Sequence, residues 1–397
     1  MKSVHGLLSG EARLPTRAMA AGRALMAVAL ASAILIPAPR AAAGESHRDH
    51  EDYFGLLRAR DLTPFGLLRL DMRPAHAVSS FPGAWGMEAE LAYQNTWALS
   101  PAVERYLAGL PGRRELGPRE VQAIRELPGE NYLVDMELAQ LDARFHYRFS
   151  THWGGYASLS ALSYRGGFLD NAIEQFHDTF GFSTFGRPAA SRNDVNLIYD
   201  LKSTQMAFFE APTSGGMLDP VVGLRYSYRS RPTTWNLILE TAAKIPLEGR
   251  RRLLSTGHVD VGIQATLQRF STHHALYLSA AGVYYDGTKS FIPTHAHVVP
   301  TFIAGYERRV SSNTHLILQG YVSPSVYTRK VTDLDELLET KYQLSAGVYH
   351  RIGRALLSFA VTENLQNINN TPDIGFQLGW AYSPALASGA QKAASAQ

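Results

Sequence analysis

The sequence predicts an all-β fold, a transmembrane antiparallel β-barrel of about twelve strands. Three observations support this fold class. Stretches of roughly 10 residues alternate large apolar side chains with small or polar ones, as outer-membrane strands do. An export signal precedes these stretches, and the links between them alternate between short and long. The last stretch, residues 374–382, shows the pattern clearly, because Phe376, Leu378 and Trp380 share one face and Gln377 lies on the other.

The N-terminal residues have the three parts of a secretory signal peptide. They are a basic part, an apolar run and a small-residue cleavage site: Arg13, Arg17 and Arg23, then 24–37, then Ala41-Ala42-Ala43. The apolar run is about 14 residues, shorter than the roughly 20 that a transmembrane helix needs. We therefore assign residues 1–43 to a signal peptide and expect the mature chain to begin near Gly44. The basic part is long, so the choice of start codon stays open.

Composition narrows the class of protein further. The chain has no cysteine, so an exported form would gain its stability from barrel closure rather than from disulfides. Its aromatic content of 10% with 19 Tyr is typical of aromatic girdles at two membrane interfaces, although any β-rich protein can share it. A net charge of +3 predicts no nucleic-acid partner. The one dense basic run, Arg250-Arg251-Arg252, is expected to be a solvated loop.

Each predicted strand places an apolar face toward lipid and a polar face toward the lumen. Pro300 falls early in one of them, and because proline lacks a ladder donor, that strand is expected to begin after it or to bulge there. The predicted strands are 85–97, 140–149, 153–165, 220–229, 234–245, 257–268, 274–286, 298–310, 314–323, 341–351, 354–363 and 373–382.

The links between these strands alternate between long and short without exception, as extracellular loops and periplasmic turns do. A soluble sandwich has no reason to follow that order. The long links lie near 99–131, 166–218, 247–256, 287–297, 327–340 and 364–372. The second long link contains two further candidate strands, Asn196–Lys202 and Gln205–Glu210. Counting both would raise the number of strands to fourteen, which is also even.

Short helices are predicted in three of the long links, which we expect to be extracellular. One helix places Leu169, Ile173, Phe176 and Phe180 on one face, with His177 and Asp178 among its polar residues. A second begins at Pro118 and runs to Leu127, and a third covers 333–339.

A charged side chain that faced lipid would cost about 2–4 kcal/mol at the bilayer midplane, so the charged positions of the predicted strands should face the lumen. These positions carry charges of both signs. They either pair across the lumen and block it, or line water-filled space. The predicted lumen-lining residues are Glu88, Glu90, Asp142, Arg144, His146, Arg148, Arg225, Glu240, Lys244, Asp260, Gln264, Glu307, Arg309 and Gln377.

Motifs for catalysis or metal binding are weak. His177 and Asp178 are helix neighbours that do not orient one another, and no G-x-S-x-G elbow follows a strand. His295 and His297 would share a strand face, yet no carboxylate or cysteine set accompanies them. We therefore predict no catalytic residue, no metal and no cofactor.

Residues 44–83 form a separate segment before the barrel of 84–382. The part from Gly55 to His76 is apolar and basic with two prolines, so a central strand is not expected there. It would plug the lumen, lie at the periplasmic rim or pair at an edge. After the last strand, residues 383–397 form a flexible tail, which is a departure from barrels that end on an aromatic residue.

Several motifs resemble a bacterial family of presumed outer-membrane proteins, the domain-of-unknown-function family three-one-eight-seven. They are Arg60–His76, Glu90–Thr96, Gly167–Asp170, Phe176–Asp178, Gly257–Gln264, Thr362–Asn367 and Asn370–Gly375. The resemblance covers most of residues 55–382 and implies an envelope barrel with no established activity. A looser similarity, in Ser255–Gly262, is to barrels that pass aromatic or aliphatic compounds.

These observations lead us to expect a passive channel or uptake barrel in the cell outer membrane of a Gram-negative bacterium. Its solute would be a small molecule, and the looser similarity suggests a hydrophobic one. The alternatives are a lipid-modifying enzyme using His146 or His177, and a structural or adhesive barrel acting through its loops. The expected partners are outer-membrane lipids, the barrel-assembly machinery and the solute.

Overall fold

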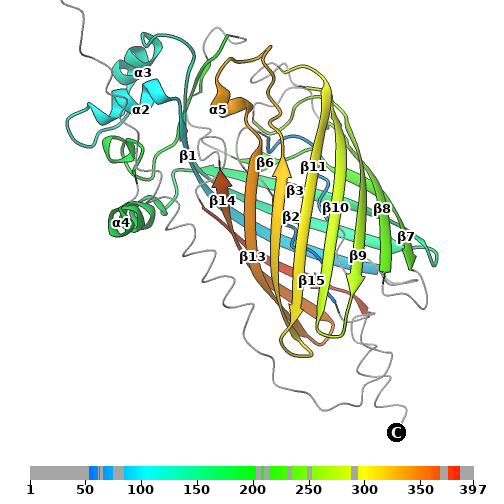
Figure 1. The fold of residues 1–397 in the computed structure, drawn as a ribbon. Helices are drawn as coiled ribbons and strands as arrows, with labels where there is room; N and C mark the ends of the chain where they lie inside the picture. The colour runs from blue at the N-terminus through cyan, green and yellow to red at the C-terminus, as the bar shows by residue number, and fades with distance from the viewer. Residues whose placement is uncertain are drawn as a thin grey trace, which may run out of the picture.

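Twelve antiparallel strands close into a barrel in the computed structural model of this chain (Figure 1). The structure describes residues 53–60, 62, 66–74, 85–181, 183–202, 207–209, 215–229, 235–247, 253–287, 294–366 and 374–384. The predicted signal peptide, the Arg250–Arg252 run and the tail beyond residue 384 lie outside the described residues. The number of barrel strands predicted from the alternation is confirmed.

The barrel strands follow chain order around the wall. They are β1 (Trp85–Leu99), β2 (Asn131–Arg148), β3 (Trp153–Arg165), β7 (Val221–Arg229), β8 (Trp235–Lys244), β9 (Asp260–Phe270), β10 (His274–Tyr285), β11 (His297–Arg309), β12 (Thr314–Ser323), β13 (Lys341–Ile352), β14 (Ala355–Gln366) and β15 (Ile374–Tyr382). The first and last strands close the sheet, with registers from Met87↔Tyr382 to Asn95↔Ile374.

The fourteen-strand alternative is wrong. Its first candidate, β4 (Asn196–Asp200), pairs with Asn131–Asp135 at the start of β2, and β5 (Ala207–Phe209) pairs with β4. These two strands extend the sheet beyond the rim, because β2 pairs with both barrel neighbours β1 and β3 over its later residues. A third short strand, β6 (Gly216–Met217), pairs with β3 in the same loop region.

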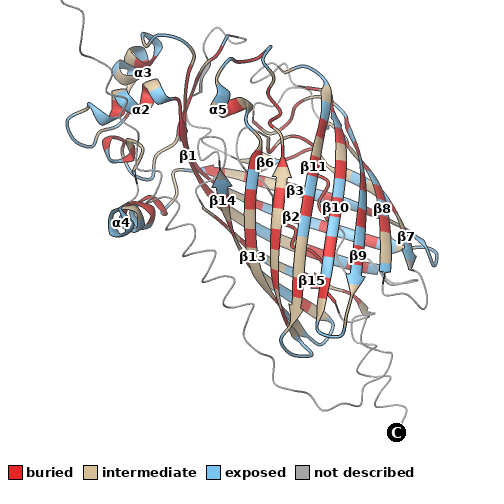
Figure 2. Ribbon diagram, in the orientation of Figure 1, coloured by how far each residue is buried: buried red, intermediate tan, exposed pale blue. Residues whose placement is uncertain are grey.

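Along the barrel strands, exposed residues alternate with buried ones (Figure 2). The exposed positions are mostly apolar, whereas the buried positions include both charged and apolar side chains. On β15, Leu378 and Trp380 are 55% and 40% exposed, whereas Gln377, which precedes Leu378, is buried. The same alternation runs along β9 and β10, where Ile263 and Leu278 are among the most exposed apolar side chains. An apolar band of this size needs a non-aqueous cover.

Short connections gather at one end of the barrel and long ones at the other, as predicted. Residues 149–152 and 271–273 are short turns, whereas 100–130 and 324–340 are long loops. Several strand boundaries differ from the prediction: β2 begins at Asn131 rather than at 140, and β11 includes Pro300, paired with Gly282 in regular register. The ladder with β12 begins only at Phe302, so Pro300 has a paired strand on one side alone.

A lobe of helices stands beside the long-loop end of β1 and β2 (Figure 1). It contains α2 (Pro101–Ala108), α3 (Pro118–Arg125), α4 (Asp170–Phe180) and the short 3-10 helix η3 (Arg187–Ala189). Its apolar core joins Val103 and Leu107 of α2 to Ile124 of α3 and Trp97 of β1. The fourth α-helix, α5 (Asp335–Leu338), lies in the loop before β13. None of the helices in the described part of the chain is long and apolar enough to cross a membrane.

The helical loop predictions are largely confirmed, with three differences. The second helix ends at Arg125 rather than Leu127, the helix α5 is shorter than 333–339, and α2 was not predicted. The expected face of α4 is also split. Leu169 and Ile173 are buried, but Phe176 and Phe180 are 47% and 58% exposed and lie against each other with ring centroids 4.7 Å apart.

Candidate functional site

The lumen holds a segment of the chain's own N-terminal part. We call residues 53–60, 62 and 66–74 the internal segment; they contain no helix or strand among the described elements. Three wall side chains hold its main-chain carbonyl oxygens. The Tyr349 hydroxyl donates to Leu56 O over 2.9 Å, Lys244 Nζ to Leu68 O over 2.9 Å, and Gln264 Nε2 to Met72 O over 2.7 Å. The segment thus crosses the barrel from the β13 wall to the β9 wall.

The start of the internal segment is bound by one carboxylate. The N–H groups of Phe54 and Gly55 donate to the two oxygens of Glu307, each over 3.0 Å. The Tyr277 hydroxyl also donates to Glu307 over 2.5 Å, and His315 Nδ1 lies 2.5 Å from its other oxygen. Glu307 is fully buried, so four neighbours supply the hydrogen bonds that water would otherwise make.

Ion pairs attach the middle of the segment to β1. Arg58 Nε lies 2.8 Å from Glu88 Oε2, and Arg58 Nη2 donates to Glu88 Oε1 over 3.0 Å. His146 Nε2 is 3.2 Å from the same Oε1 atom. Arg58 thus contacts both oxygens of Glu88 by charge and donates one hydrogen bond to it, which makes the contact a charge-assisted one.

A second cluster of charges holds the end of the segment. Arg73 Nη1 lies 2.9 Å from Glu90 and 3.1 Å from Asp142, and Arg60 Nη1 lies 3.7 Å from Asp142. Asp142 also accepts hydrogen bonds from Gln140 Nε2 and from the Ser160 hydroxyl. A carboxylate that is buried in this way is stable only because its charge is matched.

Apolar side chains of the segment fit into glycine-sized spaces in the wall. A Cβ on Gly305 would lie 2.1 Å from Leu56 Cδ2, and one on Gly262 would lie 2.8 Å from Met72 Cγ. Leu56 and Met72 are almost completely buried. The wall therefore has shape complementarity to the segment as well as charge complementarity.

The structure places most of the predicted lumen-lining residues on the inside. Eleven are less than a tenth exposed: Glu88, Asp142, Arg144, His146, Arg225, Glu240, Lys244, Asp260, Gln264, Glu307 and Gln377. Glu90, Arg148 and Arg309 are half-buried. The mixed charges pair with one another and with the internal segment, as in Arg225–Glu240 at 2.8 Å and Lys244–Asp260 at 2.8 Å.

Three predicted residues take part in the network less directly. Gln377 Nε2 donates to Glu90 over 2.9 Å, and Arg309 stacks over the Tyr53 ring at 5.2 Å. Arg148 lies at the short-turn end, where its Nε donates to Ser150 O over 3.2 Å. The arginines of the internal segment itself were not among the predicted site residues, although its basic composition was the available signal.

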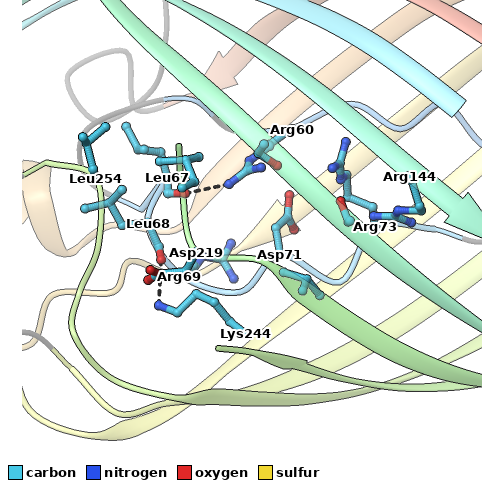
Figure 3. Close-up of a pocket in the computed structure, with 14 residues that line it drawn as sticks. Arg60, Leu67, Leu68, Arg69, Asp71, Arg73, Arg144, Asp219, Lys244 and Leu254 are labelled. Carbon is cyan, nitrogen blue, oxygen red and sulfur yellow. Dashed lines mark hydrogen bonds between the residues drawn. The ribbon is translucent and has the colours of Figure 1, made fainter. Parts of the chain in front are cut away.

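A small cavity remains between the internal segment and the wall (Figure 3). Its volume is about 30 Å³. Five cationic side chains line it, against two carboxylates: Arg60, Arg69, Arg73, Arg144 and Lys244, with Asp71 and Asp219. Figure 3 shows Arg73 and Arg144 at one end of the cavity and Leu254 at the other.

The predicted loop-helix residues lie outside the lumen. Phe168 stacks on Tyr93 of the outer wall at 5.1 Å, and the N–H groups of Phe168 and Leu169 donate to Glu137 on β2. Beneath α4, Asp170 pairs with Arg187 at 2.6 Å. Asp178 is exposed, and His177 Nδ1 lies 2.7 Å from the Ser183 carbonyl oxygen.

One carboxylate on α4 ties the helix to the neighbouring loops. Glu174 lies 2.7 Å from Arg113 Nη2 and contacts Arg192 through its other oxygen. Burial alone would raise the pKa of Glu174, but the hydrogen bonds from Arg192 and Arg113 outweigh that effect and hold the pKa below its usual range. Among the described residues, no group of three or more His, Cys, Asp or Glu side chains is arranged to hold a metal ion.

A closed antiparallel barrel with an apolar outside, a charged inside and a segment of its own chain in the lumen defines a transmembrane-type β-barrel protein. Within that class, the chain belongs to the family described as "Protein of unknown function (DUF3187)", whose model matches residues 127–383. The resemblance drawn from the motifs is thereby confirmed. No curated protein matches the chain in sequence.

Several solved barrels resemble the fold distantly. The COG4313 outer membrane channel from Pseudomonas putida F1 has 10% identity and a TM-score of 0.47, with 77% of this chain and 97% of that chain covered. The NanC porin has 6% identity and a TM-score of 0.39, with 75% and 98% covered. The CymD monoaromatic hydrocarbon channel has 10% identity and a TM-score of 0.36, with 77% and 90% covered. These values are too low to transfer a solute or a binding residue.

Proposed function

We propose that this chain is an outer-membrane uptake barrel for small polar solutes, closed by its internal segment until that segment is displaced. The apolar outer band and the alternation of short turns with long loops support the outer-membrane location. The short turns would then face the periplasm and the helical lobe the cell exterior. The N-terminal signal in the sequence is consistent with export.

The observation that carries the proposal is how the internal segment is held. It contains no helix or strand, and side chains of the wall make its main contacts, as in Arg58–Glu88 and Arg73–Asp142. Displacing it therefore breaks a limited set of contacts and leaves the β-ladder of the barrel whole. A lumen that is merely structural would be filled more stably by apolar side chains than by buried ion pairs.

The solute that suits this wall is polar. Every strand from β1 to β3 presents charged or hydroxyl side chains inward, including Glu88, Arg144 and Ser158. Removing the segment would uncover those charges, which attract polar or ionic solutes and repel hydrophobic ones. The hydrophobic solute suggested by the looser sequence similarity would instead have to use the apolar part of the wall, where Ile303, Ile317 and Leu356 are buried with Leu56 and Leu57 of the segment.

The enzymatic alternative has no arrangement in its favour among the described residues. His146 sits next to Glu88 inside the barrel, and His177 contacts a main-chain carbonyl oxygen on the outside. A hydrolase or acyltransferase would require a nucleophile within hydrogen-bond distance of such a histidine. Unchanged lipid A and phospholipids in a deletion strain would agree with transport rather than lipid modification.

A reversible cross-link tests the proposal directly. The chain has no cysteine, so the double variant Met72→Cys/Gly262→Cys introduces the only thiols, at positions whose side chains meet across the segment and β9. In planar bilayers and in liposome-swelling assays, we expect channel openings under reducing conditions and none after oxidation. The control is Met72→Cys/Gly320→Cys, because a Cβ on Gly320 would meet nothing within 4 Å.

Two results would overturn the proposal. One is a reduced double variant that inserts into bilayers but passes neither ions nor small sugars. The other is a solute flux that is equal in the oxidised and reduced states, because that flux would not depend on the internal segment.

A further inference from the structure

We propose that the cavity between the internal segment and strands β2, β3 and β8 is a binding site for a small oxyanion, a carboxylate or phosphate group, with Arg144 as its main contact. Arg144 lies on β2, points into the lumen and is 7% exposed. Its Nη1 atom is buried without a hydrogen-bond partner, and it forms no ion pair with any described residue. A buried guanidinium N–H group in that state is costly and requires an explanation, and a bound water or anion is one that fits a group lining a cavity.

The internal segment explains why Arg144 is unpaired. The register of β1 and β2 places Arg144 directly opposite Glu88, which would be its natural partner. Glu88 instead directs its two oxygens to Arg58 and His146. Arg58 of the internal segment therefore pairs with Glu88, the carboxylate that lies opposite Arg144 in the barrel sheet.

One side of the Arg144 guanidinium is covered, and its edge is left for a ligand. The Tyr156 ring lies under it, with Arg144 Cζ 4.7 Å from the ring centroid. A cation stacked on an aromatic face keeps its N–H groups in the guanidinium plane, directed outward. That planar fork matches the two oxygens of a carboxylate or phosphate.

The rest of the cavity lining supports an anion rather than a cation at this end. Arg60 and Arg73 also line the cavity, and Figure 3 places Arg73 at the same end as Arg144. Arg73 is paired with Asp142 and Glu90, and Arg60 lies near Asp142, whereas no ion pair is found for Arg144 among the described residues. Of the two acids in the lining, Asp219 comes from the loop before β7 and accepts a hydrogen bond from the Ser255 hydroxyl at Oδ2 over 2.7 Å, whereas its Oδ1 is buried without a hydrogen bond.

The size of the cavity limits the ligand. A volume of about 30 Å³ corresponds to roughly two or three water-sized groups. That space suits the head of a carboxylate or a phosphate group and excludes a whole sugar ring. The lining continues to Leu218 and Leu254 of the long loops, so the rest of a larger solute would extend toward that end.

This inference rests on the proposed function only in naming the bound anion as part of the solute. Binding itself needs no conduction, so it can be measured on the full chain in detergent. We would titrate the purified protein with inorganic phosphate and with acetate by calorimetry. We expect saturable binding of at least one of them, weakened at least tenfold by Arg144→Gln.

The matched control is Arg148→Gln. Arg148 is on the same strand and the same side of the barrel, but it is bonded to the turn at Ser150 and does not line the cavity. The Arg148→Gln variant should bind the anion with the same affinity as the unchanged protein. Arg144→Lys keeps the charge and loses the fork, so its affinity should be intermediate, and it provides a second reading if Arg144→Gln does not fold.

Absence of saturable binding of both phosphate and acetate to the unchanged protein would overturn the site. Equal affinity in Arg144→Gln and Arg148→Gln would overturn it as well. A barrel that binds phosphate through Arg144 yet passes no solute would refute the transport proposal alone. A conducting barrel that binds neither anion would refute the site alone.

Discussion

Arg58 and Glu88 form a two-point ion pair inside the barrel, with distances of 2.8 Å and 3.0 Å and side chains that are 2% and 4% exposed. Arg58 belongs to the internal segment and Glu88 to the first barrel strand. The pair is therefore a direct link between the segment and the wall, and its removal reports on how tightly the lumen is closed.

Replacing Arg58 with methionine should loosen the internal segment. The change keeps much of the side-chain volume but removes the Arg58 charge from the buried Glu88, and breaking a buried pair in this way costs about 3–5 kcal/mol. Hydrogen–deuterium exchange should show faster exchange at Phe54 to Met72, with barrel strands unaffected. The control, Arg329→Gln, removes an exposed pair with Asp335 and should leave exchange in the segment unchanged. Equal protection in both variants would contradict the role of the pair.

Adding a methyl group to the wall should displace the segment where the two surfaces fit closely. In Gly305→Ala, the new Cβ would lie 2.1 Å from Leu56 Cδ2, so the buried leucine must move, at a cost of about 1–3 kcal/mol. Gly320→Ala on the neighbouring strand β12 adds the same atom where nothing lies within 4 Å. Bilayer recordings should show more frequent openings for the first variant only. Identical recordings for the two would argue against close packing of Leu56 on the wall.

Glu307→Gln should release the start of the segment. A glutamine side chain has one oxygen in place of two, so the four donors around Glu307 can no longer all be satisfied, and each charge-assisted hydrogen bond is worth about 1.5–3 kcal/mol. Limited proteolysis should cleave near Phe54 sooner than in the unchanged protein. The exposed replacement Glu126→Gln, just after α3, serves as the comparison, and a cleavage rate matching it would refute the prediction.

The attachment of α4 should weaken in acid. Hydrogen bonds from Arg192 and Arg113 hold the pKa of Glu174 below its usual range, despite burial. A lowered folded-state pKa contributes stability that is present above the unfolded pKa and is lost as the pH falls through the folded value. A spin label on Asn171→Cys should therefore become more mobile as the pH falls below about 4.5.

The same label in a Glu174→Gln background provides the control for acid sensitivity. It should already be mobile at pH 7 and should change little across the acid range. A label that stays immobile down to pH 2 in the parent would show that Glu174 does not hold the helix.

The barrel wall could be predicted well because its signal is local. A period of two assigned Leu378 outward and Gln377 inward without knowledge of any partner strand. The number of strands followed from this alternation, and the order of short and long links agreed with it. The two segments left as alternatives, 196–202 and 205–210, extend the sheet beyond the rim, and that distinction depends on which residues of β2 they meet.

The site depends on contacts distant in sequence, which no local pattern reveals. Arg58 and Arg73 belong to a stretch whose composition allowed three positions, and only the folded barrel places them next to Glu88 and Asp142. The helix α2 was also not predicted, but for a different reason, because its signal is local. Its Pro101 suits a first helical turn, and Val103 and Leu107 have helical spacing, so the signal was available but short.

The closure of β1 on β15 imposes an order on assembly. The internal segment directly precedes β1 in the chain, and β1 is the strand whose pairing from Met87 to Asn95 seals the sheet to the last strand made. Buried arginines cannot pass sideways through a sealed ladder. The segment must therefore enter before or during sealing, or thread through an open end afterwards. In this barrel, the part of the chain that is synthesised first is enclosed by a seam that requires the last strand.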